Sequence, residues 1–198
     1  DPKYKGGYRS WWGFETLPEV NEETPSFVEF ITGEGGVIDT WLRRGAAGFR
    51  LDVADELPDA FIEKIRTAVK RVSPEKFLLG EVWEDATTKF GFDHRRTYLL
   101  GKGLDSVMNY PFKNSVLDFV MGKPAQQAAN EILSICEHYP APAINTALNF
   151  LSTHDTERAL TVIADEPANG RGREWQSGRS VTGEAYEEGM LRLRMAYA

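Results

Sequence analysis

The sequence predicts an α/β fold in which parallel strands alternate with helices. Four short apolar runs have the length and composition of buried strands, and they lie at residues 47–52, 77–83, 104–110 and 147–154. Amphipathic segments of helical length accompany them, at residues 26–44, 58–72, 114–121, 124–139 and 184–198. This alternation is the pattern of βαβ units, and four such strands make half of an eight-stranded barrel.

Residue periodicity supports the individual helices. Residues 58–72 begin with a proline near the first turn and carry apolar side chains at helical spacing, at positions 61, 62, 65, 68 and 69. Residues 26–44 predict one or two pieces, because the glycine-rich residues 33–36 interrupt them. The Gly- and Arg-rich residues 169–179 predict a surface loop.

Composition excludes several classes of protein. The 198 residues include 23 Lys and Arg against 30 Asp and Glu, a formal net charge of −7, so we expect neither nucleic acid nor a membrane as a partner. No run approaches the roughly 20 apolar residues of a membrane span. The single Cys136 excludes an internal disulfide, and this favours a cytoplasmic location, although no targeting signal assigns one.

Both ends of the sequence indicate an excised segment. Residue 1 is Asp rather than Met, and the helical pattern of residues 190–198 stops without a capping signal. We therefore expect a partial domain that is inactive on its own.

Carboxylates lie at the ends of the predicted strands. Arg50 and Asp52 alternate along their strand and point to the same side, where the guanidinium keeps Asp52 ionised. Glu81 emerges from an apolar strand beside an aromatic residue, a setting that favours its protonated form. One charged and one neutral carboxyl group are what glycoside hydrolysis needs, the first to attack the sugar carbon and the second to protonate the leaving oxygen.

Other interpretations of the same residues remain open. Spacing alone also allows a cation site, because Asp52, Asp55 and Glu56 can supply oxygen ligands. A single Asp at a strand end is often a turn or helix-cap residue, and a lone aromatic such as Trp83 is usually core. At a third strand end, the His154–Asp155 pair suits sugar hydroxyls and a developing oxocarbenium charge.

Three segments in order resemble the motifs of barrel strands four, five and seven in the α-amylase family (glycoside hydrolase family 13): Gly48-Phe-Arg-Leu-Asp-Val-Ala-Asp-Glu56, Gly80-Glu-Val-Trp83 and Phe150-Leu-Ser-Thr-His-Asp155. Three more are similar to the neopullulanase and cyclomaltodextrinase branch: Tyr8-Arg-Ser-Trp-Trp-Gly-Phe14, Leu17-Pro-Glu-Val-Asn21 and Met108-Asn-Tyr-Pro-Phe112. The resemblance implies an incomplete (β/α)8 barrel of the TIM type. Residues 26–198 would hold about strands four to seven, and residues 1–25 the end of a small domain inserted after strand three.

The resemblance also implies a role for each residue at the strand ends. Asp52 would be the nucleophile that forms a covalent glycosyl intermediate, and Glu81 the general acid and then base. Asp155 would be the third carboxylate, which grips hydroxyls of the reacting sugar. Arg50 would hold Asp52 ionised and oriented, and His154 would bind hydroxyls beside Asp155.

Residues around these carboxylates are further candidates for substrate binding. Trp83 and Tyr110 offer rings for sugar stacking, as does Phe112, for which core packing is at least as good an interpretation. Glu56 would contact the acceptor sugar or begin the next helix. The branch usually has Asn where this chain has Asp55, which adds a charge near the acceptor side.

The implied activity is that of a retaining hydrolase of α-1,4 and optionally α-1,6 glucosidic bonds in maltooligosaccharides, cyclodextrins or pullulan. Two alternatives stay open: a glucan transferase using the same residues, and a non-catalytic carbohydrate-binding relic, against which the presence of all three carboxylates argues. We expect no cofactor and no metal ligand in this segment, with calcium an option for the full-length enzyme. The expected partner is an oligosaccharide or α-glucan substrate, with a homodimer of the full-length enzyme as a further option.

Overall fold

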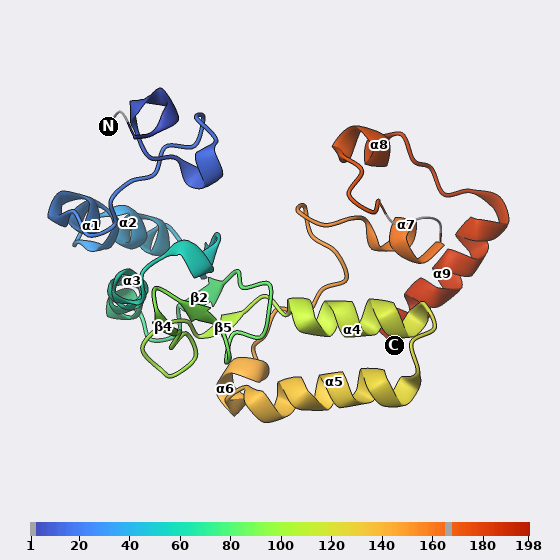
Figure 1. Ribbon diagram of the computed structural model, residues 1–198. Helices are drawn as coiled ribbons and strands as arrows, with labels where there is room; N and C mark the ends of the chain where they lie inside the picture. The colour runs from blue at the N-terminus through green and yellow to red at the C-terminus, as the bar shows by residue number, and fades with distance from the viewer. Residues whose placement is uncertain (1–2, 165–167) are drawn as a thin grey trace. The chain divides into compact units, whose positions relative to one another are not determined.

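A computed structural model of the chain describes residues 3–164 and 168–198 (Figure 1). The chain divides into two compact units. The first contains the residues up to Gly48 together with Leu57–Phe77, and the second contains Phe49–Glu56 and Leu78–Ala198. Among the described residues, no helix is both long and apolar enough to cross a bilayer.

Three helices organise the first unit: α1 (Pro25–Thr32), α2 (Val37–Arg43) and α3 (Asp59–Val72). They follow short 3₁₀ turns, η1 (Lys5–Gly7) and η2 (Trp11–Gly13). A buried ion pair joins the helices, because Arg71 on α3 donates both to Asp39 on α2 (3.0 Å) and to the carbonyl of Thr32 at the end of α1 (2.9 Å). Asp39 is 2% exposed, so its charge depends on these partners.

The sheet that carries the predicted strand ends has the order β1 (Gly48–Leu51), β2 (Phe77–Gly80) and β5 (Ser106–Val107). Strands β2 and β5 are parallel, with Leu79 opposite Ser106. The chain continues this parallel order at a single bridge between Met108 and Leu148. Three predicted strand segments thus pair in sequence order, and the predicted α/β class is confirmed.

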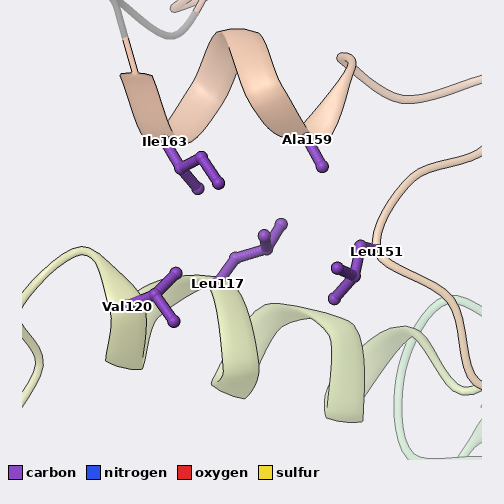
Figure 2. Packing of buried hydrophobic residues seen from close by; sticks show 5 residues of the cluster. All are labelled: Leu117, Val120, Leu151, Ala159 and Ile163. Atoms are coloured by element: carbon purple, nitrogen blue, oxygen red, sulfur yellow. The ribbon is translucent and has the colours of Figure 1, made fainter. Parts of the chain in front are cut away.

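Helices of the second unit pack around an apolar cluster. Leu117 and Val120 on α4 (Tyr110–Val120) face Ala159 and Ile163 on α7 (Ala159–Ala164), with Leu151 beside them (Figure 2). The unit also contains η3 (Ala54–Glu56), the hairpin β3 (Phe90–Gly91) and β4 (His94–Arg95), α5 (Ala125–His138), α6 (Ala141–Ile144), α8 (Arg173–Ser177) and α9 (Gly183–Tyr197). Helices α4 and α5 run side by side (Figure 1).

The structure corrects several predicted boundaries. Helix α4 begins at Tyr110 rather than at residue 114, because the Asn109 side chain accepts the N–H of Phe112 and caps the helix (3.2 Å). The strand expected at 104–110 is accordingly shorter, and the one expected at 147–154 is reduced to the bridge at Leu148. The loop expected at 169–179 contains α8. The expected domain boundary after residue 25 remains a prediction.

The buried Asp39 gives a testable prediction about stability. Hydrogen bonds from the Gly35 N–H and the Arg71 guanidinium lower the pKa of Asp39 below its ordinary value. A lowered folded-state pKa stabilises the fold above the unfolded-state pKa, and this contribution is lost as the pH falls through the folded-state value. Asp39→Asn should therefore lower the melting temperature by about 5 °C at pH 7, and by less near pH 3, in thermal unfolding followed by circular dichroism. An equal loss at both pH values would contradict this account.

Candidate active site at the strand ends

Two carboxylates directly follow neighbouring strands. Asp52 comes after β1 and Glu81 after β2. The backbone joins the two ends, because the Glu81 N–H donates to the carbonyl of Leu51 (3.0 Å) and the Ala54 N–H to the carbonyl of Glu81 (3.1 Å). The carboxyl ends of neighbouring strands therefore meet at one edge of the sheet, which is where sites are built in parallel α/β folds.

A single arginine connects both carboxylates. Arg50 Nη1 contacts Asp52 Oδ1, and Arg50 Nη2 lies 3.0 Å from Glu81 Oε1. The side chain of Asp52 is 74% exposed, whereas that of Glu81 is 4% exposed. The guanidinium thus holds one accessible and one buried carboxylate on the same side of the sheet.

The carboxyl group of Glu81 lies among hydrogen-bond donors. The Val53 N–H donates to Oε2 (2.9 Å), while Trp83 Nε1–H and the Tyr110 hydroxyl donate to Oε1 (3.0 and 3.3 Å). The apolar setting that the sequence suggested for Glu81 is therefore wrong at the carboxyl group. Burying this carboxyl group without hydrogen-bond partners would cost free energy, and the polar atoms of Trp83 and Tyr110 supply such partners.

Trp83 and Tyr110 form a stacked pair beside Glu81. Their ring centroids are 4.4 Å apart at an interplanar angle of 14°, and Phe150 meets Tyr110 edge-on at 4.8 Å. Trp83 is 46% exposed, so it is not a core residue. Tyr110 is 1% exposed, so its ring is covered and only its hydroxyl points to the site, contrary to the stacking role expected for it. Phe112 is half-buried.

The charge of the third carboxylate also acts on the Tyr110 hydroxyl. Burial raises the pKa of the Tyr110 hydroxyl above its ordinary value, and the charges of Glu81 and Asp155 raise it further, against a hydrogen bond with Thr153. Asp155 in turn lies 3.1 Å from the Nε2 atom of His154. The hydroxyl therefore stands within the field of both carboxylates.

An open cavity of about 690 Å³ adjoins these residues. Its walls include Trp83, His154 and Asp155 from the strand ends, together with basic side chains of Lys113, Arg171 and Arg173. Partial burial lowers the pKa of Lys113, against the attraction of nearby carboxylates. The cavity offers aromatic, anionic and cationic groups on one surface, a combination suited to a ligand rich in hydroxyl groups.

Asp55 and Glu56 lie in the turn η3, which follows Asp52. The Asp55 carboxylate accepts the Tyr98 hydroxyl (2.7 Å) and pairs with the ammonium of Lys89 (2.9 Å), so its charge is neutralised within the protein. Glu56 is exposed and does not begin the next helix. Within residues 3–164 and 168–198, no three His, Cys, Asp or Glu side chains are arranged to hold a metal ion. The geometry therefore does not support the cation site.

Sequence reasoning missed the contribution of Val53. Its backbone adopts φ +42°, a left-handed conformation that is rare for a β-branched residue. A glycine at this position would have signalled such a turn, but valine carries no such signal. The contacts of Asp55 with Lys89 and Tyr98 were equally invisible, because they join residues more than 30 positions apart.

Comparisons with known proteins identify similar sequences over most of the chain. The family described as "Alpha amylase, catalytic domain" matches residues 5–174. An amylopullulanase of Thermoanaerobacter thermohydrosulfuricus is 34% identical over 196 residues, covering 84% of this chain and 13% of that protein. A cyclomaltodextrinase of Bacillus sp is 35% identical over 154 residues, covering 76% of this chain and 25% of that protein. The chain thus spans a quarter or less of the length of these relatives.

Solved structures extend the similarity to the fold. The cyclic α-maltosyl-(1→6)-maltose hydrolase from Arthrobacter globiformis aligns with a TM-score of 0.71 at 29% identity, over 80% of this chain and 34% of that one. A debranching enzyme of Nostoc punctiforme aligns with a TM-score of 0.71 at 30% identity, over 83% of this chain and 35% of that one.

The buried hydroxyl of Tyr110 gives a prediction that a titration can check. Tyr110→Phe should remove a phenol that ionises above the ordinary value of 10.0. The difference in phenolate absorbance between wild type and variant, recorded against pH, should therefore have a midpoint above 10.0. Tyr139→Phe is a matched control, because burial raises the pKa of Tyr139 to about 12. A Tyr110 midpoint below 10.0 would contradict the burial of its hydroxyl beside the Glu81 carboxylate.

Proposed function

The chain belongs to the α-amylase catalytic-domain family, a family of TIM-barrel glycoside hydrolases, and on this premise we propose that its protein is a retaining α-glucan hydrolase. Its substrates are maltooligosaccharides, cyclodextrins or pullulan, cleaved at α-1,4 and, as a further option, α-1,6 bonds. The relatives named amylopullulanase and cyclomaltodextrinase support this range of substrates.

One observation carries the proposal: the Arg50 guanidinium binds both Asp52 and Glu81. Retaining glycosidases need a nucleophile and an acid/base group close together, so that both reach the same glycosidic bond. A cation between two carboxylates allows them to approach, because it offsets their mutual repulsion. The exposure of Asp52 suits attack on the sugar, and the burial of Glu81 suits proton transfer away from bulk water.

The reaction has two steps. In the first, an Asp52 oxygen bonds to the anomeric carbon while Glu81 gives its proton to the departing glucosidic oxygen. In the second, the Glu81 carboxylate takes a proton from water, the water oxygen bonds to the anomeric carbon, and the bond to Asp52 breaks. Inversion at each step returns the original α configuration.

The remaining residues bind the sugar or orient Glu81. Asp155 and His154 lie on the cavity wall, where they accept hydrogen bonds from hydroxyls of the reacting ring and donate hydrogen bonds to them. The exposed indole of Trp83 packs against the apolar face of a sugar next to Glu81. The Tyr110 hydroxyl orients Glu81, and the exposed Glu56 contacts the acceptor sugar.

Trp83 also favours a second candidate function, glucan transfer. Its ring is exposed next to the residue that assists the departing and incoming groups, so a second sugar can replace water there. Maltotriose separates the two functions. Hydrolysis gives glucose and maltose alone, whereas transfer also gives products longer than maltotriose.

Glu81→Gln provides the first test. A glutamine cannot give or take the proton, so turnover of maltotriose should fall by about 10²–10⁴-fold while substrate binding is retained. The measurements are steady-state kinetics and calorimetric binding in the full-length protein. Glu131→Gln, on the exposed side of α5, is the matched control and should retain wild-type turnover. Wild-type turnover in Glu81→Gln would disprove the acid/base role of Glu81.

The configuration of the first product tests the retaining mechanism. Proton NMR of a fresh maltotriose digest should show the α anomer before mutarotation, because two inversions restore the starting configuration. A slow fluorinated maltosyl fluoride should leave a covalent adduct on the peptide that contains Asp52. An initial β anomer without an adduct would establish single inversion instead.

A further inference from the structure

The turn that follows Asp52 donates two backbone hydrogen bonds to Glu81. Val53 at φ +42° directs its N–H to Glu81 Oε2 (2.9 Å), and the next N–H, that of Ala54, donates to the Glu81 carbonyl (3.1 Å). The turn closes on itself where the Glu56 N–H donates to the Val53 carbonyl (3.0 Å). Left-handed backbone at a β-branched residue costs free energy, so it persists only where surrounding contacts impose it.

Asp55, in the same turn, has contacts through both its side chain and its backbone. The Asp55 carboxylate accepts the hydroxyl of Tyr98 and pairs with Lys89, while its backbone carbonyl accepts Arg96 Nη1 (2.8 Å). Tyr98 and Arg96 are buried, at 1% and 3% exposed, and the Arg96 guanidinium lies 4.4 Å from the centroid of the Tyr98 ring. The turn is thus held to residues 89–98 by contacts of both the side chain and the backbone of Asp55.

We propose that Asp55 is a positioning residue, which holds the strained turn at Val53 so that its N–H fixes the carboxyl group of Glu81 for proton transfer. This inference rests on the proposed function. It assigns a structural use to the carboxylate that stands where the related branch usually has Asn. Lys89 helps to hold Asp55 in the same way. Burial lowers the pKa of Lys89, but hydrogen bonds to Glu84 and Asp55 raise it overall and keep the ammonium charged.

Loosening the turn should act on Glu81 more than on Asp52. Asp52 follows directly on β1 and has its own contact with Arg50, whereas the Val53 N–H depends on the turn. A misplaced acid slows reactions whose leaving group needs a proton, and a displacement of about 1 Å can cost 100-fold. Fluoride departs without a proton from the enzyme, so a glycosyl fluoride does not need the acid.

The experiment compares kcat/KM for maltotriose and for α-maltosyl fluoride in the full-length protein. Asp55→Ala, which removes both side-chain contacts, should lose about 10–100-fold on maltotriose and less than about 3-fold on the fluoride. Tyr98→Phe removes one hydroxyl and should lose about 3–10-fold on maltotriose alone. Asp55→Asn keeps an oxygen for Tyr98 and should fall between wild type and Asp55→Ala.

Lys89→Met and Lys123→Met form a matched pair. Both lysines are 23% exposed and each contacts two carboxylates, but the partners of Lys123 are Asp118 and Glu131, which lie outside the turn. Lys89→Met should show the selective loss on maltotriose, and Lys123→Met should show none. Thermal unfolding of each variant identifies any that fail to fold, and Tyr98→Phe, as the mildest change, then carries the test.

Glu81→Gln, measured with the same two substrates, separates this inference from the proposed function. Selective loss in both Glu81→Gln and the Asp55 set supports the positioning role. Selective loss in Glu81→Gln alone, with equal or no loss in the Asp55 set, overturns that role and leaves the function standing. Equal loss on both substrates in Glu81→Gln overturns the acid assignment and the role of Asp55 with it.

Discussion

The contact of one guanidinium with two carboxylates is the interaction on which the site depends. Glu81 is buried at the end of β2, where an unpaired carboxylate would be strongly destabilising. Arg50 supplies the opposing charge, and its fork also reaches Asp52. The planar fork of arginine can serve two oxygens at once, which a lysine ammonium on a flexible stem does less well. The parallel pairing of the sheet is what brings these three side chains to one edge.

Backbone geometry also determines the orientation of Glu81, which the charge of Arg50 alone does not fix. Gly80 precedes Glu81, and a Cβ at this position would come within 2.2 Å of the Leu104 side chain. A glycine there lets the segment before β5 pack directly against the end of β2. On the other side, the strained Val53 turn brings its N–H to the second carboxylate oxygen. Close packing and local strain together hold Glu81 in one orientation.

Much of this arrangement follows from the sequence. The helical periods of residues 58–72 and 124–139 agree with α3 and α5, and the glycines at 33–36 separate α1 from α2 as expected. Strand alternation correctly placed Arg50 and Asp52 on one side. What the sequence could not supply were contacts made after folding, such as that of Asp55 with Tyr98, and the polar surroundings of Glu81. An apolar strand gives no sign that a neighbouring indole will present its N–H.

The groups around Glu81 differ in whether they can contact both its carboxylate form and its protonated form. The indole N–H and the Val53 N–H can only donate hydrogen bonds to Glu81, and the guanidinium of Arg50 contributes a fixed positive charge beside it. A hydroxyl can reverse its role, and Tyr110 is the member of the group that can accept a hydrogen bond from a protonated Glu81. The raised pKa of Tyr110 keeps that hydroxyl neutral and able to act in both directions. A residue first identified as a stacking surface thus has the chemistry to accompany the acid/base group through both of its protonation states.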